Sequence, residues 1–167
     1  MHKILTLIIC VVAYTCVFPQ TAEEHYKLAN SKYNAGNYKA AIIEYTKAIT
    51  LNPNYADAYN DRGYAFFDVK DYKSAMADFN KVIELNPGYV LSYYNRGLIY
   101  FILKNYELAL KDFDNVIELN PTFAMAYNNR GAAKYNLGDK NGACMDWQKA
   151  GDLGTKSGYE NIKKYCK

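Results

Sequence analysis

The feature that most constrains this chain is a period of 34 residues. The hexapeptide VIELNP occupies residues 82–87 and occurs again at residues 116–121, and proline stands in the same phase at Pro53, Pro87 and Pro121. Repetition with a period of about 20–50 residues is typical of solenoids, in which each supersecondary unit stacks on its neighbours. The period divides the chain into four predicted units: residues 22–55, 56–89, 90–123 and 124–156.

Small and aromatic residues recur within each unit at fixed positions. Position 8 is Ala or Gly, position 20 is Ala, and position 24 is Tyr45, Phe79, Phe113 or Trp147. In YKAAIIEYTKAITL (residues 38–51) apolar residues follow one another at steps of three and four, which indicates a helix. A turn near position 15 and a proline at position 32 then make each unit a predicted helix hairpin. The predicted helices are 22–35, 38–51, 56–69, 72–85, 90–103, 106–119, 124–137, 140–152 and 157–166.

This pattern resembles the tetratricopeptide repeat, whose signature has the same period and the same small and aromatic positions. The resemblance implies an all-α fold: a right-handed α-solenoid of four helix-hairpin repeats, in which the first helices line a concave groove. The fourth unit diverges, because Lys140 replaces the aromatic residue of position 17 and Thr155 replaces the proline. Residues 157–167 are expected to form a capping helix, since the last repeat of a solenoid needs a cover.

The first twenty residues differ from the repeats. Lys3 precedes fifteen uncharged residues, ILTLIICVVAYTCVF, and the first acids are Glu23 and Glu24. A positive start followed by a short apolar run is typical of a secretory signal peptide, and an uncleaved anchor is the second choice because a bilayer span needs ~20 residues. We expect residues 1–20 to be removed and the protein to be exported to the periplasm or cell envelope, or secreted, without membrane insertion. Lipid attachment at Cys16 is a lesser alternative.

The residue inventory does not favour catalysis. After the signal segment the chain has one histidine, His25, and four serines, from which a histidine-rich metal site or a Ser-His-Asp triad is not readily built. His25 occupies a position that is tyrosine in the other units, so we expect an aromatic packing role. The formal charge of +3 without a basic stripe argues against nucleic acid. We predict a non-enzymatic protein with no metal and no cofactor.

Arginine at position 7 and aspartate at position 23 recur in the last three units. In a hairpin that turns at position 15 these positions face each other, so we expect structural ion pairs of Arg62 with Asp78, Arg96 with Asp112 and Arg130 with Asp146. The alternative is that the arginines form a ladder for acidic ligands.

Two cysteines are predicted to meet near the C-terminus. If the last helix folds back around residue 155, Cys144 faces Cys166, and an oxidising compartment would let them form a disulfide. The alternative is two independent thiols at an apolar junction.

The resemblance assigns positions 2, 5, 6, 9, 12 and 13 of each first helix to the concave groove. These positions carry amides, which donate to and accept from a peptide backbone, and aromatic rings, which bury side chains. Position 2 is Glu23, Asp57, Leu91 or Met125, which does not match the clamp for terminal carboxylates known in the family. The predicted partner-binding residues are Tyr26, Asn30, Tyr33, Asn60, Tyr64, Phe67, Tyr94, Asn95, Leu98, Phe101, Asn128, Asn129 and Tyr135.

These observations predict an exported adaptor or scaffold that binds a peptide or protein partner in its groove. Tyr94, Leu98, Phe101 and Ile102 form an apolar stripe that we expect to contact that partner most. One alternative is a structural subunit that stacks end to end with copies of itself, because solenoid ends are apolar unless capped. A weaker alternative is glycan binding through surface tyrosines. The oligomeric state is left open.

Overall fold

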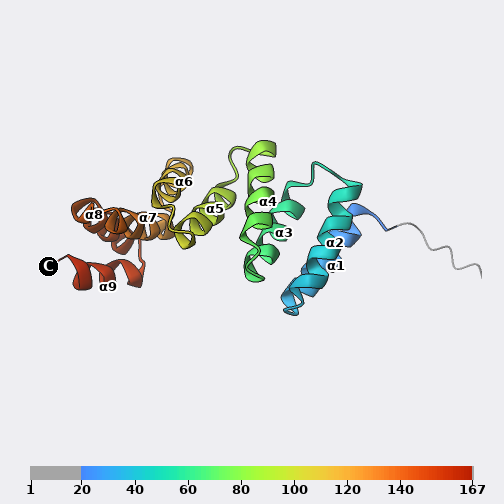
Figure 1. The fold of residues 1–167 in the computed structure, drawn as a ribbon, viewed down its shortest axis with the longest axis horizontal. Coiled ribbons are helices and arrows are strands. Elements are labelled where there is room, and N and C mark those ends of the chain that lie inside the picture. The colour runs from blue at the N-terminus through green and yellow to red at the C-terminus, as the bar shows by residue number, and fades with distance from the viewer. Residues whose placement is uncertain (1–19, 167) are drawn as a thin grey trace, which may run out of the picture.

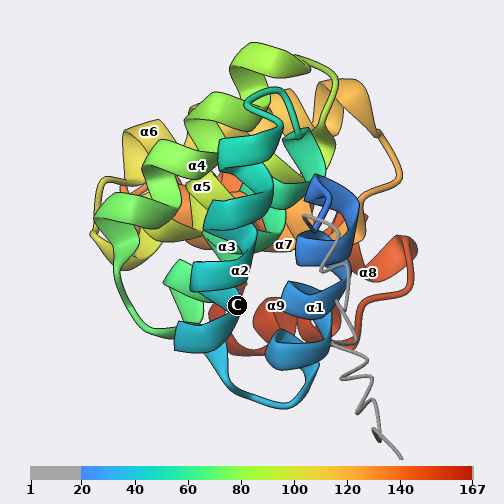
Figure 2. The same ribbon diagram turned by 90° about the vertical axis from the view of Figure 1, so that its right-hand side faces the viewer.

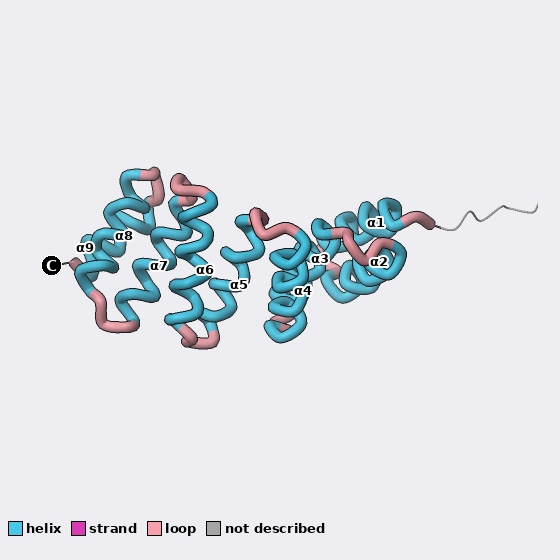
Figure 3. Tube along the Cα trace, turned by 90° about the horizontal axis from the view of Figure 1, so that it is seen from above, coloured by secondary structure: helices cyan, strands magenta, loops and turns pink. Residues whose placement is uncertain are grey.

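The computed structural model describes residues 20–166, which form nine helices and no strand (Figure 3). Each helix begins and ends within one residue of its predicted bounds, so the all-α prediction is confirmed. The predicted signal segment, with Cys16, lies outside the described residues except for Gln20. The helices are α1 (Ala22–Asn34), α2 (Tyr38–Leu51), α3 (Ala56–Asp68), α4 (Tyr72–Leu85), α5 (Val90–Ile102), α6 (Tyr106–Leu119), α7 (Ala124–Asn136), α8 (Lys140–Asp152) and α9 (Lys156–Tyr165).

The helices form hairpins that follow one another in a row. Figure 1 shows the row running from α1 and α2 at one end to α7, α8 and α9 at the other. Within a hairpin the two helices pack together, and each second helix also packs on the first helix of the next hairpin. Viewed from the α1 end, the hairpins are turned relative to one another (Figure 2). The result is the solenoid that the 34-residue period predicts.

Side-chain caps explain several helix starts. The Thr21 hydroxyl accepts from the backbone N–H of Glu24 at 3.2 Å, and the Glu24 carboxylate accepts from the N–H of Thr21 at 2.8 Å. This capping box satisfies donors that the first turn of α1 leaves unpaired. Asn37, Asp71 and Asp139 cap α2, α4 and α8 in a simpler way, each accepting from the N–H three residues later.

The turn inside each hairpin requires a left-handed residue. Gly36 and Gly138 supply it with φ of 75° and 91°, whereas Lys70 and Lys104 adopt φ of 62° in the second and third hairpins. Left-handed backbone costs an L-residue roughly 1–2 kcal/mol relative to the right-handed form, and glycine avoids that cost. The two lysine turns are therefore local points of strain in the middle of the row.

Glycine at position 8 lets the two helices of a hairpin approach closely. A Cβ atom added to Gly63, Gly97 or Gly131 would lie 2.7 to 2.8 Å from an aromatic ring at position 24. Those rings are Phe79, Phe113 and Trp147, and each is at most 1% exposed. The core thus depends on a glycine that faces a large ring, which explains why both positions recur in phase.

The last helix covers the end of the row. Gly158 of α9 meets α8 so closely that an added Cβ would lie 2.6 Å from the Gly151 nitrogen. At the other end of α9 the Tyr165 ring lies 5.4 Å from the Trp147 ring and 4.8 Å from the Tyr135 ring. Helix α9 therefore caps the last hairpin, as the fold prediction stated.

Candidate functional site

The recurrent arginines are held inside the framework. Arg62 donates from Nε and Nη2 to the two carboxylate oxygens of Asp78 at 2.8 and 2.7 Å. Arg96 holds Asp112 in the same way, at 2.8 and 2.6 Å, and Arg130 holds Asp146 at 2.9 and 2.6 Å. The aspartates are between 2% and 4% exposed, so each bidentate pair joins the two helices of a hairpin in a low-dielectric setting. We refer to these pairs as the clasps.

Each clasp also reaches back to the preceding hairpin. The third guanidinium nitrogen, Nη1, donates to position 25 of the repeat before: Thr46 at 3.0 Å, Asn80 at 2.6 Å and Asp114 at 2.7 Å. The guanidinium planes further lie over Tyr59, Tyr93 and Tyr127, 5.4 to 5.7 Å from the ring centroids. Because all three guanidinium nitrogens are engaged in this way, the arginines are not placed to form a ladder for acidic ligands.

Burial shapes the electrostatics of the clasps. It raises the pKa of Asp78, and hydrogen bonds and charge from the Arg62 guanidinium act in the opposite direction. Breaking such a pair leaves a buried carboxylate without its partner, which is more costly than the pair is worth. The clasps are thus a structural element of the solenoid.

The first hairpin has no clasp, and a different set of contacts joins its two helices. Leu28 stands at position 7, and Glu44 is held instead by His25 Nδ1 at 2.7 Å and by Lys47 Nζ at 2.9 Å. Burial acts to raise the pKa of Glu44, but the hydrogen bonds from Lys47 and His25 outweigh it, so that pKa lies below its ordinary value. His25 is buried, as a packing role predicts, and its ring also contacts the Glu44 carboxylate, which the sequence analysis did not predict.

Tyrosine hydroxyls link the first helices of successive repeats along the inner side. Tyr26 donates to Asp61 at 2.7 Å and Tyr33 donates to Asp68 at 2.6 Å, both from α1 to α3. At the junction of the third and fourth repeats the direction is reversed, and Asn129 Nδ2 donates to the Tyr94 hydroxyl at 2.8 Å. These partners are 35 residues apart, which is one repeat plus one residue.

Two predicted groove residues do not lie on an open surface. Asn60 and Asn95 are 3% and 4% exposed. Asn60 donates to Asp61 at 3.0 Å and accepts from Ser92 at 3.4 Å, inside the junction of the second and third hairpins. The prediction that they present amides to a ligand is wrong, because both side chains are buried between repeats.

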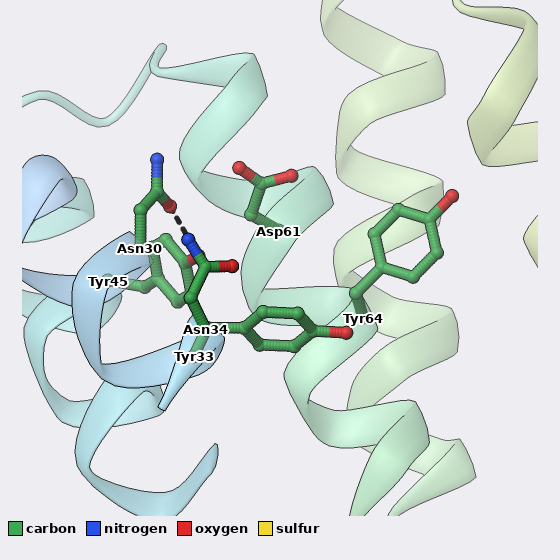
Figure 4. Close-up of a pocket in the computed structure, with 6 residues that line it drawn as sticks. All are labelled: Asn30, Tyr33, Asn34, Tyr45, Asp61 and Tyr64. Carbon is green, nitrogen blue, oxygen red and sulfur yellow. Dashed lines mark hydrogen bonds between the residues drawn. The ribbon is translucent and has the colours of Figure 1, made fainter. Parts of the chain in front are cut away.

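An open pocket of about 280 Å³ lies on α1, α2 and α3. Figure 4 shows amides of α1 on one side, the Tyr64 ring on the other, and the Asp61 carboxylate between them. Burial raises the pKa of Asp61, while hydrogen bonds from Tyr26 and Asn60 act to lower it. Three of the groove residues that the family resemblance predicts, Asn30, Tyr33 and Tyr64, line the pocket. The full lining is Asn30, Tyr33, Asn34, Tyr45, Asp61 and Tyr64.

Tyr45 lines the pocket although it was not among the predicted groove residues. Position 24 was predicted to serve packing, and the Tyr45 ring is indeed buried, but its hydroxyl donates to the Asn30 side chain. The signal was available, because the equivalent residues in the other hairpins are Phe79, Phe113 and Trp147, without a hydroxyl. A tyrosine in a position that otherwise carries rings without a hydroxyl indicates a polar neighbour.

Most of the other predicted groove residues lie in the second, third and fourth hairpins, where they pack against neighbouring side chains. Phe67 and Phe101 pack on the tyrosines that open α4 and α6, with ring centroids 5.7 and 5.3 Å apart. Leu98 is partly buried, and Tyr94 lies 5.0 Å from the Phe123 ring. In the last hairpin α9 covers part of the surface: Asn128 accepts from Asn161 at 3.1 Å, and Tyr135 lies under Tyr165.

The structure also brings the two C-terminal cysteines together. The Cα atoms of Cys144 and Cys166 lie 5.9 Å apart, within the range that a disulfide requires. Formation of the bond in the protein stays a prediction. Among residues 20–166 no helix has the length and apolarity to span a membrane, and no group of three or more His, Cys, Asp or Glu side chains is arranged to hold a metal ion.

Comparison with known proteins identifies the repeats. Tetratricopeptide repeat models match residues 26–90 and 90–123. No curated protein matches the chain in sequence. A crystal structure of MamA superposes with a TM-score of 0.77 at 27% identity, covering 86% of this chain and 81% of that one. The MamA fragment from Desulfovibrio magneticus RS-1 shares the fold with a TM-score of 0.78 at 24% identity, covering 87% and 86%.

A further solved structure is similar in sequence as well as in fold. It is the first tetratricopeptide domain of Spaghetti (RPAP3) bound to the HSP90 peptide SRMEEVD. The TM-score is 0.69 at 31% identity, and the match covers 73% of this chain and 97% of that domain. Proteins of this fold are typically scaffolds without enzymatic activity. From the period, the helix hairpins and these matches together, the chain belongs to the tetratricopeptide repeat family.

Proposed function

We propose that this chain is an exported, non-enzymatic adaptor that binds an extended peptide segment of a partner protein on the inner side of its first helices. The observation that carries the proposal is the open pocket on α1, α2 and α3, which combines amides, aromatic rings and one carboxylate. Amides can pair with both groups of a peptide backbone, and rings can bury its side chains. Export rests on the N-terminal sequence alone, as does placement in the periplasm or cell envelope.

The size of the pocket supports a peptide over a small molecule. About 280 Å³ lies just below the range of ~300–1,000 Å³ that is usual for drug-sized ligands. It is suited to one side chain of a longer segment that continues along the row of first helices. The similar domain bound to the HSP90 peptide uses the same fold for such a ligand, which supports this mode of binding here.

Binding to an array of immobilised dodecapeptides of randomised sequence would test the proposal. The mature protein should bind a subset of peptides, and Asn30→Ala combined with Asn34→Ala should weaken that binding at least tenfold. Lys111→Ala is the matched control, because Lys111 is exposed on α6, away from the pocket, and should change nothing. Absence of binding to any peptide, with the circular dichroism of a folded helical protein, would reject peptide binding.

Self-association is a second candidate, favoured by the surface at the α1 end of the row. Leu28 and Leu51 are 37% and 56% exposed there, and Leu28 occupies the position from which later arginines reach the preceding repeat. An open hollow of about 360 Å³ is lined by Leu51 together with His25 and Lys47. Light scattering across concentrations would reveal growth of the assembly, and Leu51→Glu should abolish that growth. A constant monomer mass excludes this candidate.

A further inference from the structure

We infer that the pocket on α1, α2 and α3 selects a cationic side chain, so that the bound segment carries a lysine or arginine at this point. The inference deepens the proposed function and rests on it. It comes from the distribution of charge along the inner side of the molecule, from the composition of the pocket and from the lack of a salt-bridge partner for Asp61 among the described residues.

Carboxylates gather on the inner side of the first two repeats. Asp61 lies in the pocket, with Glu23, Asp57 and Asp68 on the same first helices, α1 and α3. The equivalent positions of the third and fourth repeats hold no charge. They are Leu91, Asn95, Ile102, Met125, Asn129 and Asn136.

Three of these carboxylates accept hydrogen bonds from tyrosine hydroxyls and have no cation beside them. Tyr26, Tyr33 and Tyr89 donate to Asp61, Asp68 and Asp57 respectively. Glu23 accepts from Tyr55 at 2.9 Å and lies 3.3 Å from Lys27, with both charged side chains well exposed. Within residues 20–166, Asp57, Asp61 and Asp68 take part in no salt bridge. A hydroxyl orients a carboxylate but leaves its negative charge in place.

The pocket adds aromatic faces to this charge. Tyr33 and Tyr64 stand beside Asp61 in the lining, as Figure 4 shows. A cation gains from a carboxylate and from the electron-rich face of a ring at once. An acidic side chain would meet the Asp61 charge in a partly buried setting, where like charges repel more strongly than in water. The chemistry of the pocket therefore favours lysine or arginine and disfavours glutamate or aspartate.

This preference would set the chain apart from the similar domain whose bound peptide ends in Glu-Glu-Val-Asp. The clasp arginines offer no compensating positive surface, because their donors are engaged with Asp78, Asp112 and Asp146 and with the preceding repeat. A shared fold is thus compatible with an opposite charge preference, since ligand chemistry depends on side chains that the repeat signature leaves free.

Fluorescence anisotropy with matched peptides tests the inference. The tightest peptide from the array is synthesised with lysine, glutamine or glutamate at each position in turn. At one position the lysine form should bind at least tenfold more tightly than the glutamine form, and the glutamate form should bind most weakly. Asp61→Asn, which keeps an acceptor for the Tyr26 hydroxyl, should reduce the lysine preference to less than threefold. Glu118→Gln removes an exposed carboxylate on α6 and should leave the preference intact.

A second variant keeps the test valid if Asp61→Asn lowers stability. Asn34 is exposed at the end of α1, so Asn34→Arg places a competing cation at the pocket without disturbing the core. It should weaken the binding of the lysine peptide at least fivefold more than it weakens the binding of the glutamine peptide. Equal affinity for all three peptide forms, or a preference that survives both variants, overturns the cationic pocket while peptide binding stands. Absence of binding to every peptide overturns the proposed function itself.

Discussion

The first two hairpins and the last two share a framework and differ in the surface that they present. Both halves place an arginine between two helices and over a tyrosine ring, with Arg62 and Arg130 as equivalent examples. On the inner side, however, the first half carries four carboxylates, whereas the second carries neutral residues that include the exposed Ile102 and Met125, at 44% and 46%. Residues that recur thus build the solenoid, and residues that do not recur determine what it binds.

The two ends of the row differ as well. Helix α9 packs on α8 and places Tyr165 over Trp147, so the last hairpin is covered. The first hairpin leaves Leu28 and Leu51 exposed and holds Glu44 through His25. The inner side is therefore acidic in the uncovered first half and uncharged at the equivalent positions of the capped second half, although the helices repeat regularly.

The largest expected effect is on the junction between the halves. Arg96 of α5 holds Asp112 and reaches back to Asn80 of α4, so Arg96→Ala removes the clasp that joins the second hairpin to the third. It leaves Asp112, 2% exposed, without its cation, and we expect the free energy of unfolding to fall by about 3–5 kcal/mol. Urea denaturation monitored by circular dichroism measures this loss. A loss below about 1 kcal/mol, the range of exposed pairs, would show that the clasps do not hold the framework.

The cap of the second half should depend on the predicted disulfide. Cys144 and Cys166 are 22 residues apart in sequence, and a bridge across such a loop contributes about 3 kcal/mol in the chain-entropy account. Adding a reductant should therefore lower the stability of the C-terminal half and release α9, while the pocket at the other end keeps its affinity for peptide. Mass spectrometry of alkylated, unreduced mature protein should find no free thiol. Two alkylated cysteines would reject the bridge.

The helices were predictable because each depends on residues close in sequence. The apolar spacing, the glycine or lysine turn and the proline at position 32 bound α1 to α8 within one residue. The discrepancies have a local cause: Ala35, Val69, Leu103 and Leu137 are C-caps that precede the left-handed residue, so each first helix ends one residue early.

The candidate site was less predictable, because it depends on residues one repeat apart. The family resemblance assigned Asn30 and Tyr33 to the groove, and both line the pocket. It did not reveal that Asn60 and Asn95 are covered, since exposure at those positions is decided by the side chains of neighbouring repeats. The contact of Tyr26 with Asp61, 35 residues away, shows the same dependence on packing between repeats.

Introducing a carboxylate into the second half, at the position equivalent to Asp61, would test the contrast between the halves. Asn129 stands at the repeat position of Asp61, and it contacts Tyr94 as Asp61 contacts Tyr26. In Asn129→Asp the Tyr94 hydroxyl can turn to donate, which recreates the pair of the first half. We expect the affinity for a second lysine in the peptide to rise about threefold, in the range of an exposed charge pair, as measured by anisotropy. Asn136→Asp, at an exposed position at the end of α7, is the control. If it gives the same gain in affinity, the added negative charge alone explains the gain, and the position of Asn129 does not matter.

The smallest expected effect concerns the turns, where the middle hairpins differ from the outer ones. Lys70 and Lys104 adopt φ of 62°, whereas Gly36 and Gly138 occupy the equivalent positions of the first and last hairpins. Lys70→Gly or Lys104→Gly should stabilise the fold by about 0.5–1 kcal/mol, because relief of left-handed strain exceeds the entropy that glycine adds to the unfolded chain. Thermal melts compare them with Lys73→Gly, a helical control that should destabilise by a similar amount. If neither variant is more stable than the original protein, the claim that these two turns are strained is wrong.

The central claim is that the inner side of the first two repeats binds a cationic peptide. The most direct measurement is a titration of ¹⁵N-labelled mature protein with the lysine peptide, followed by two-dimensional NMR of the backbone amides. The account predicts that the largest shift changes cluster at Asn30, Asn34, Asp61 and Tyr64, with small changes in α6 and α9. Changes centred on the outer helices α4 and α6, or on the exposed residues Leu28 and Leu51, would contradict it.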